Sequence, residues 1–326
     1  MAVKTTCPYC GVGCGVIADR DAAGTVTVRG DQLHPANFGK LCGKGSALAE
    51  TVGLEGRLLA PVVNGQDVGW DAALDHVAEE FGRIIREHGP DAVAFYVSGQ
   101  ILTEDYYVIN KLAKGFIGTA NIDTNSRLCM ASSVAGHKRA FGSDTVPGCY
   151  EDLETADLLV LVGSNAAWCH PILYQRMMAA KANNPACRVV VIDPRRTATC
   201  DGADLHLPLR SGSDSVLFNG LLAHLASQGA IDRAFVDGFT SGAEAAIKQV
   251  IGQTVAQTAE ICGLSEGAVA LFFDWFASNE RVRPCNERCC RSSDGRTTVS
   301  TSFSRSNAIA AGSCWASTPL GPLTVT

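Results

Sequence analysis

Residues 6–15 read TCPYCGVGCG and place three thiols in one tight loop, at Cys7, Cys10 and Cys14; a fourth thiol follows at Cys42. Three close cysteines and one distant cysteine supply the four thiolates that a [4Fe-4S] cluster requires. Glycines flank these cysteines, and they let backbone N–H groups approach the sulfurs, which tunes the potential of such a cluster. The spacing therefore predicts an iron–sulfur cluster at the start of the chain.

Two other uses of the four cysteines stay open. A zinc site has two close pairs of Cys or His ligands, whereas Cys42 stands apart from any second partner. Disulfides need an oxidising compartment, and the first residues show neither an apolar signal core nor a twin-arginine run. The spacing favours the iron–sulfur interpretation over both, and we expect a cytoplasmic chain.

The composition is that of a globular protein. The chain has 326 residues, of which 46% are hydrophobic and 18% charged, with a net charge of −6. That balance argues against a general nucleic-acid surface. No run of eighteen apolar residues occurs, so we expect no membrane span. Fourteen cysteines in a reducing compartment point to metal ligation for some and burial for the rest.

The periodicity divides the chain into three predicted regions. Residues 1–57 form a small β-rich iron–sulfur domain, with a hairpin over 15–19 and 25–29. Residues 58–281 form an α/β region in which buried strands alternate with helices, and this order favours a parallel sheet covered on both faces. The predicted strands are 91–99, 157–163, 188–193 and 205–209, and the predicted helices are 70–88, 103–116, 129–141, 171–182, 214–227, 243–251 and 266–278. The fold class is α/β, with an incomplete three-layer, Rossmann-like region.

The character of the chain changes in the third region, residues 282–326. This segment is rich in Ser, Thr and Arg and shows no strand or helix period. One interpretation is a disordered tail. A sharper hypothesis is a frameshift relative to an ancestral gene, because the change is abrupt inside what looks like a continuing fold.

Five motifs together resemble the molybdopterin oxidoreductases that carry a bis(molybdopterin guanine dinucleotide) cofactor. The cysteine loop of residues 6–15 looks like its version in assimilatory nitrate reductases. Four further stretches follow in the family's order: NIDTNSRLCM (121–130), GSNAAWCHP (163–171), DPRRT (193–197) and RSGSD (210–214). The resemblance covers residues 5 to about 281. Members of this family are at least twice as long, so the chain looks like an N-terminal portion.

The resemblance implies roles for two residues on the electron path. Lys44, two residues beyond the last cluster cysteine, is expected to bridge cluster and pterin and to provide a positive charge there. Taken alone, Cys129 is better explained as a buried inert cysteine. Its match within 121–130 instead implies the thiolate ligand of molybdenum, at the start of the predicted helix, where the pKa of a thiol is lowered.

The same resemblance implies a dinucleotide site at the ends of the strands. In open α/β sheets, ligands bind beyond the carboxyl ends of the strands. Ser164 and Asn165 can contact ribose or phosphate, Asp193 can accept hydrogen bonds from ribose or guanine, and the Arg residues can pair with pyrophosphate. Asp214 is a helix cap or a guanine contact, and the two readings stay level. The predicted contacts are Lys44, Gly163, Ser164, Asn165, Asp193, Arg195, Arg196, Gly212 and Asp214.

These implications give one functional prediction and two alternatives. The chain is expected to be part of a molybdenum- and iron–sulfur-dependent catalytic subunit that reduces nitrate to nitrite by two-electron oxo transfer in assimilation. Electrons would come from ferredoxin, flavodoxin or an NADH-linked reductase subunit. The isolated 326 residues are expected to be inactive, because later domains line the site in this family. The alternatives are a formate dehydrogenase alpha-subunit-like protein and a non-catalytic iron–sulfur electron-transfer module.

Overall fold

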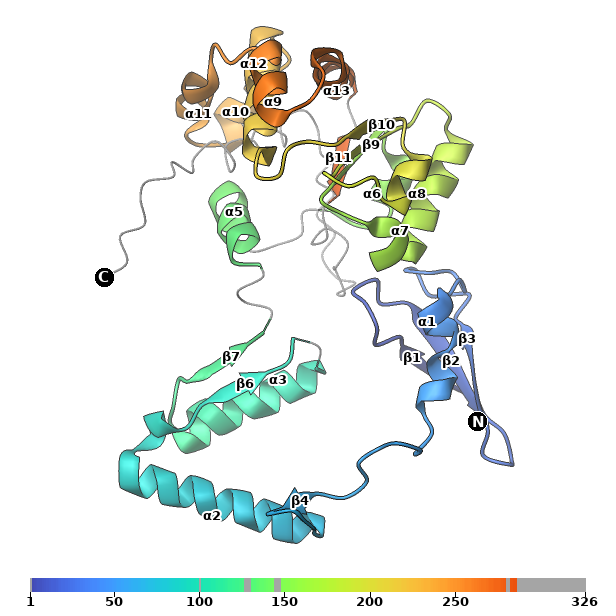
Figure 1. The fold of residues 1–326 in the computed structure, drawn as a ribbon, viewed down its shortest axis with the longest axis vertical. Coiled ribbons are helices and arrows are strands. Elements are labelled where there is room, and N and C mark those ends of the chain that lie inside the picture. The colour runs from blue at the N-terminus through green and yellow to red at the C-terminus, as the bar shows by residue number, and fades with distance from the viewer. Residues whose placement is uncertain (1, 100, 126–129, 144–147, 280–281, 286–326) are drawn as a thin grey trace. The chain divides into compact units, whose positions relative to one another are not determined.

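The computed structural model describes residues 2–99, 101–125, 130–143, 148–279 and 282–285. The chain forms two compact units (Figure 1). The larger unit comprises Met1–Ala49 together with Ala135–Thr326, and the smaller unit comprises Glu50–Val134. The N-terminal cysteines therefore belong to the same unit as the main sheet.

A three-stranded antiparallel sheet opens the larger unit, in the order β1 (Ala2–Thr6), β2 (Gly15–Arg20) and β3 (Val26–Gly30). The predicted hairpin is confirmed by the pairing of β2 with β3. Strand β1 was not predicted, because its five residues are all exposed and show no alternation. Its pairing places Thr6 opposite Gly15, so the cysteine loop is the connection between β1 and β2. The short helix α1 (Gly43–Ser46) begins directly after Cys42, and a 3₁₀ turn follows at Leu48–Thr51.

The main sheet is parallel, as predicted. Its strands are β8 (Leu158–Val162), β9 (Arg188–Ile192), β10 (Leu205–Leu207) and β11 (Val282–Cys285), in the order β10-β9-β8-β11. Strand β11 falls within the segment for which no strand was expected, and that expectation is wrong for its residues. Backbone pairing along β8, from Val282 opposite Leu158 to Cys285 opposite Leu161, forms the strand without an apolar period.

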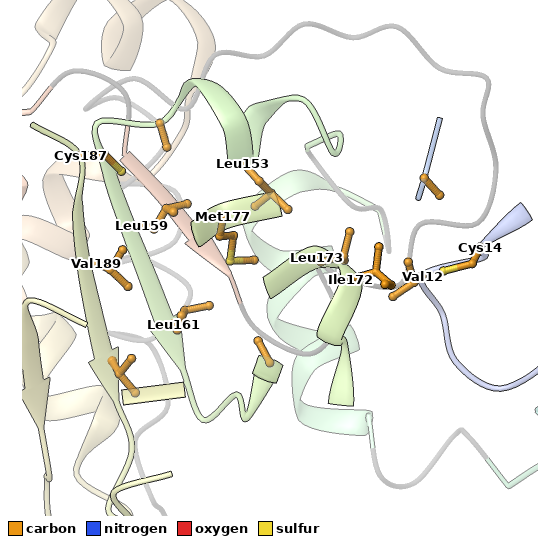
Figure 2. Close-up of a cluster of buried hydrophobic side chains, with 14 of the residues drawn as sticks. Val12, Cys14, Leu153, Leu159, Leu161, Ile172, Leu173, Met177, Cys187 and Val189 are labelled. Atoms are coloured by element: carbon orange, nitrogen blue, oxygen red, sulfur yellow. The ribbon is translucent and has the colours of Figure 1, made fainter. Parts of the chain in front are cut away.

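Side chains of β8 and β9 alternate between two buried layers. On one face, Leu159, Leu161, Val189 and Val191 pack with α6 (Asp152–Thr155) and α8 (Pro171–Asn183). Figure 2 shows three of these side chains, Leu159, Leu161 and Val189, together with Leu153 of α6 and Met177 of α8. On the other face, Leu158, Val160, Val190 and Ile192 pack with α9 (Asp214–Ser227), α12 (Val255–Cys262) and α13 (Glu266–Ser278). Each fully buried aliphatic side chain contributes about 1.5–3 kcal/mol. Both faces of the sheet are covered, as the sequence predicts.

Shorter elements complete the larger unit. Helix α7 (Ala166–Cys169) follows β8, and the 3₁₀ turn Ala198–Gly202 follows β9. Helices α10 (Arg233–Phe239) and α11 (Ala243–Val250) pack beside α9 around a third apolar cluster. Helix α5 (Ala131–Phe141) contains the point along the chain, after Val134, at which the smaller unit ends and the larger unit resumes.

The smaller unit contains the hairpin β4 (Val62–Val63) and β5 (Gln66–Asp67), then α2 (Trp70–His88). The parallel pair β6 (Phe95–Val97) and β7 (Ile122–Thr124) follows, with α3 (Thr103–Asn110) and a π-helical turn at Lys111–Ile117 between the strands. The predicted buried strand over 91–99 is shorter than expected and is not buried. Pro90–Ala92 form a 3₁₀ turn instead, and Tyr96 is 77% exposed.

Within the residues that the structure describes, no single helix combines the length and the apolar composition needed to span a membrane. The consecutive helices α12 and α13 meet those criteria only when taken together, across a bend of 119°.

Candidate functional site

All four predicted cluster ligands line one pocket. Cys7, Cys10, Cys14 and Cys42 share it with apolar walls from Val12, Leu41 and Ile172, and Tyr9, Gly45 and Pro171 complete the lining. Figure 2 shows Val12 and Cys14 next to Ile172, at the start of α8. Cys7 and Cys14 are 8% and 7% exposed. The structure therefore brings together the four thiols that the spacing predicted, against one face of the α/β core.

The loop is closed by backbone and side-chain contacts that the sequence did not reveal. The Cys7 N–H donates to the Cys14 carbonyl over 2.9 Å. Asn37 is 1% exposed, and its Oδ1 accepts from the Gly15 N–H at 2.8 Å. Its Nδ2 donates to the carbonyls of Gly15 at 3.1 Å and Lys40 at 2.8 Å. Asn37 thus ties the end of the cysteine loop to the segment that leads to Cys42.

Gly15 is required by close packing. A Cβ at this position would lie 2.3 Å from the His34 side chain. Gly13 is required by conformation, because its φ of +67° lies in the left-handed region. Both glycines let the loop turn tightly between Cys10 and β2.

The pocket disfavours the thiolate form of Cys7 and Cys14 when no cation is bound. Burial, and to a smaller extent the neighbouring thiols Cys10 and Cys7, raise the pKa of Cys14 to about 12. Burial likewise raises the pKa of Cys7, and the Lys44 ammonium lowers it by a smaller effect. Four thiolates in these surroundings therefore require a cationic group to neutralise them.

Four cysteines line one pocket, and four thiolates are the ligands that a [4Fe-4S] cluster requires. Among the described residues, no group of three or more Cys, His, Asp or Glu side chains was found that could hold a single metal ion. The donor set that the described residues give the pocket, four cysteines and no histidine or carboxylate, fits the cluster that the sequence predicts.

The second group of predicted residues lies at the carboxyl edge of the main sheet. Val162 pairs with Ile192, and Ile192 pairs with Leu207, so β8, β9 and β10 end side by side. The turn after β8 begins at Gly163, whose φ is +55°. Strand β11 lies on the opposite side of β8 from β9, so this turn sits where the strand order reverses, which is where ligands bind in open α/β sheets.

Two predicted residues there are held by neighbouring groups. The Thr199 hydroxyl donates to Asn165 Oδ1 at 2.9 Å and accepts from the Ala167 N–H at 3.1 Å. Asp193 is buried, and its Oδ1 accepts from the Arg195 N–H at 2.8 Å. Thr199 was not predicted, because no strand ends at its position in the sequence. These contacts fix the turns after β8 and β9 relative to each other.

Two hydroxyls at this edge have no internal partner. Ser164 Oγ and Thr197 Oγ1 are buried and make no hydrogen bond within the described part of the chain. An unsatisfied buried hydroxyl is unfavourable by about 1–3 kcal/mol unless a ligand or water completes it. The orphaned hydroxyls fit a polar ligand such as the phosphates or ribose of a dinucleotide.

The remaining predicted contacts are more exposed. Arg195 and Arg196 are exposed, and Arg196 lies 3.9 Å from Asp201. Gly212 has a φ of +84°, and Asp214 is the first residue of α9. Ser213 occupies the cap position, but its Oγ donates to the Arg210 carbonyl at 2.6 Å rather than capping the helix. The arginines thus stay available to solvent and to an anionic ligand.

Cys129 lies outside the described residues, together with 126–128. The predicted helix over 129–141 corresponds to α5, which begins at Ala131. The assignment of Cys129 as a molybdenum ligand stays a prediction.

Comparison with known proteins gives two family matches. The model described as "Molybdopterin oxidoreductase Fe4S4 domain" matches residues 1–53, and the model described as "Molybdopterin oxidoreductase" matches residues 57–312. The second match continues beyond β11 into the segment with the atypical composition. The frameshift hypothesis remains untested by it.

Individual relatives and one solved structure agree with these matches. A nitrate reductase from Klebsiella oxytoca is 59% identical over 279 residues, which is 86% of this chain and 32% of the relative. The F420-dependent formate dehydrogenase subunit alpha of Methanocaldococcus jannaschii is 32% identical over 285 residues, covering 86% of this chain and 41% of that one. Acetylene hydratase from Pelobacter acetylenicus has the same fold, with a TM-score of 0.77 at 24% identity, over 88% of this chain and 41% of that structure. The chain spans about a third of the length of the nitrate reductases it matches.

Proposed function

The chain belongs to the molybdopterin oxidoreductase family, and from that premise we propose that it forms the cluster-holding and dinucleotide-binding part of a nitrate reductase. The two matched domains indicate a [4Fe-4S] cluster and a molybdenum–molybdopterin cofactor. The observation that supports nitrate as substrate is the 59% identity to the Klebsiella oxytoca nitrate reductase. The formate dehydrogenase subunit is a more distant relative.

At the N-terminal pocket, the chain's own contribution is to gather and shield four thiols. Cys7, Cys10, Cys14 and Cys42 would hold the cluster, and the apolar walls exclude water from the sulfurs. Lys44 places a positive charge beside them, since its ammonium already acts on the pKa of Cys7. A cation there favours the reduced, more negative state of a bound cluster.

At the carboxyl edge of the sheet, the residues would bind and orient the cofactor's guanine dinucleotide arms. Ser164 and Asn165 lie in one turn and Asp193 in the next, while Arg195 and Arg196 offer cations to the phosphates. Gly163, Gly212 and Asp214 would complete the contacts. Cys129 would supply the thiolate for the metal, and when bound, the molybdenum cofactor supplies the two-electron removal of an oxygen atom from nitrate.

Two further elements of the proposal concern the cellular role. The likeness of residues 6–15 to the assimilatory version of the loop supports a cytoplasmic enzyme of nitrate assimilation. Its electron donor would be a ferredoxin, a flavodoxin or an NADH-linked reductase subunit. Because the chain spans about a third of the length of its relatives, these 326 residues alone are proposed to hold the cluster without reducing nitrate.

A chimera tests the substrate assignment. The matching part of the Klebsiella oxytoca nitrate reductase would be replaced by the 279-residue stretch of this chain that aligns with it. The proposal predicts nitrate-dependent oxidation of reduced viologen and no formate-dependent viologen reduction, with nitrate reduction lost in a Cys129→Ala version. Formate-dependent activity would favour the formate dehydrogenase alternative. Iron without molybdenum in a folded chimera would favour a non-catalytic electron-transfer module.

A further inference from the structure

A buried arginine joins the α/β core to the segment between β3 and Cys42. Arg176, on α8, is 5% exposed, and its Nε lies 2.7 Å from Glu154 Oε1 on α6. One of its terminal nitrogens donates to the carbonyls of Pro35 at 2.8 Å and Ala36 at 3.1 Å. Ala36 precedes Asn37, whose side chain is hydrogen-bonded to the backbone of Gly15 and Lys40. Arg176 therefore holds the same segment that closes the cysteine pocket.

A tyrosine makes the matching contact to the cysteine loop itself. The Tyr150 hydroxyl shares its one proton between the carbonyls of Val12 at 2.9 Å and Gly11 at 3.2 Å. The Arg176 guanidinium lies 5.5 Å from the centre of the Tyr150 ring and 5.2 Å from that of Phe38. The two side chains thus form one connected unit, which we call the Tyr150–Arg176 clamp.

The clamp acts on the parts of the loop that set the surroundings of the sulfurs. The C=O and N–H groups of one trans peptide point in opposite directions. Anchoring the carbonyls of Gly11 and Val12 on Tyr150 therefore fixes the direction of the N–H groups of Val12 and Gly13. The Gly13 N–H donates to the Cys10 carbonyl at 3.3 Å, so its peptide plane helps to close the loop between Cys10 and Cys14. The Val12 N–H lies in the same loop, and hydrogen bonds to the sulfurs are among the factors that set the potential of a cluster.

We propose that Tyr150 and Arg176 are positioning residues for the cluster, which they serve by fixing the peptide planes of the Cys10–Cys14 loop and the segment that leads to Cys42. Neither side chain lines the pocket, and the hydrogen bonds that tie both to the N-terminal segments end on backbone carbonyls, so the clamp acts through the backbone. The inference rests on the proposed function only in that a cluster occupies the pocket.

The test compares two tyrosine-to-phenylalanine variants of the full chain, purified without oxygen and loaded with iron and sulfide. Tyr150→Phe removes the hydroxyl and keeps the ring over Arg176. Tyr106→Phe is the matched control, because the Tyr106 hydroxyl also donates to one backbone carbonyl, that of Ser98 at 3.1 Å, but in the smaller unit. The readouts are the rate of iron release to a chelator, the midpoint potential and the EPR spectrum of the reduced cluster.

We expect Tyr150→Phe to take up as much iron as wild type but to release it about fivefold faster, as the loss of one hydrogen bond of ordinary strength implies. Its midpoint potential and EPR spectrum should also change, while Tyr106→Phe matches wild type in all three readouts. Arg176→Lys, which keeps the charge but loses the planar fork, should accelerate iron release as well. It provides the second variant if Tyr150→Phe fails to fold.

The outcomes separate this inference from the proposed function. A wild-type chain that binds a cluster, with Tyr150→Phe and Arg176→Lys both indistinguishable from Tyr106→Phe, overturns the clamp alone. A folded wild-type chain that takes up no iron overturns the cluster assignment, and the clamp with it. A release rate that changes without any shift in potential or EPR spectrum also contradicts the positioning role, since general loosening would produce it.

Discussion

The cysteine pocket and the carboxyl edge of the main sheet differ in how many of their functional groups are already satisfied by the protein itself. The pocket gathers four thiols among apolar walls, and burial raises the pKa of Cys14 to about 12. At the sheet edge, by contrast, Asn165 and Asp193 already have hydrogen-bond partners within the chain. Only two buried hydroxyls there, those of Ser164 and Thr197, are left without a partner among the described residues.

The difference predicts how each region depends on its ligand. The pocket can hold thiolates only when a cation neutralises them, so its charge state is set by the metal. The sheet edge is held in place by its own hydrogen bonds, and a few of its polar groups are left for a ligand to bond. We therefore expect substitutions in the pocket to change cofactor content, and substitutions at the edge to change stability modestly and in either direction.

The largest effect should come from removing one sulfur ligand. Cys14→Ala leaves three of the four thiolates, and we expect it to lose most of the bound iron. Cys187→Ala is the control, because Cys187 is also buried, at 1% exposure, in the same apolar cluster but outside the pocket. Iron and sulfide analysis of both purified variants checks this. Equal iron content in the two variants would contradict the claim that the pocket cysteines, unlike a cysteine in the core, bind the iron.

The pocket should also make the cluster-free chain sensitive to alkali. Burial raises the pKa of Cys14 from an ordinary value of 9.0 to about 12 in the folded state. Between these values the unfolded chain releases a proton that the folded chain keeps. The contribution of this thiol to the free energy of unfolding is therefore fully present below about pH 9 and falls as the pH rises toward 12. The equilibrium constant for unfolding rises by up to tenfold for each pH unit in that range.

Denaturant titrations at a series of pH values from 7 to 11 would show this slope. In Cys14→Ala the slope should be reduced, and in the cluster-loaded chain it should be absent for this group, because the sulfurs there are already thiolates. Identical slopes in wild type and Cys14→Ala would show that burial does not hold the thiol neutral.

At the sheet edge, two hydroxyl deletions should act in opposite directions. Thr199→Val removes a hydroxyl that bonds to both Asn165 and Ala167, and we expect it to lower the free energy of unfolding by about 1–2 kcal/mol. Ser164→Ala removes a buried hydroxyl that has no partner among the described residues, and it should leave stability unchanged or raise it by up to about 1 kcal/mol. Urea denaturation of the ligand-free chain measures both. A large loss in Ser164→Ala would mean that its hydroxyl is already satisfied.

The smallest effect should follow from the loss of the exposed cation beside the pocket. Lys44→Gln should leave iron content unchanged and make the midpoint potential of the cluster more negative, because the positive charge favours the reduced state. An exposed charge is worth about 0.2–1 kcal/mol, which is on the order of 10–40 mV for one electron. Lys248→Gln, on α11, is a control elsewhere in the same unit. Redox titration of both variants tests whether the Lys44 charge acts on the cluster.

The sequence predicted the regular elements best where capping and periodicity agreed. Helix α13 spans the predicted residues 266–278, because Ser265 accepts a hydrogen bond from the Ala268 N–H and apolar residues recur behind it. Strand β1 and helices α10 and α12 were missed. The strand is held by backbone pairing with no apolar alternation, and the two helices are short, with 7 and 8 residues.

The site residues could be predicted from the sequence where they lie close together along the chain in a recognisable spacing. The four cysteines and the polar turns after β8 and β9 could be located from the chain alone. The groups that hold them could not, since Tyr150 and Val12 are 138 residues apart in the sequence. Asn37 and Thr199 give no local signal either, because an amide or a hydroxyl becomes informative only when the fold shows its partner.

The central claim is that the four N-terminal thiols hold an iron–sulfur cluster, and metal analysis tests it most directly. The full chain would be purified without oxygen, and its iron, acid-labile sulfide, zinc and molybdenum would be quantified on the same sample. We predict about four iron and four sulfide per chain, with most of both lost in Cys14→Ala. A folded wild-type chain that holds one zinc and neither iron nor sulfide would contradict the account.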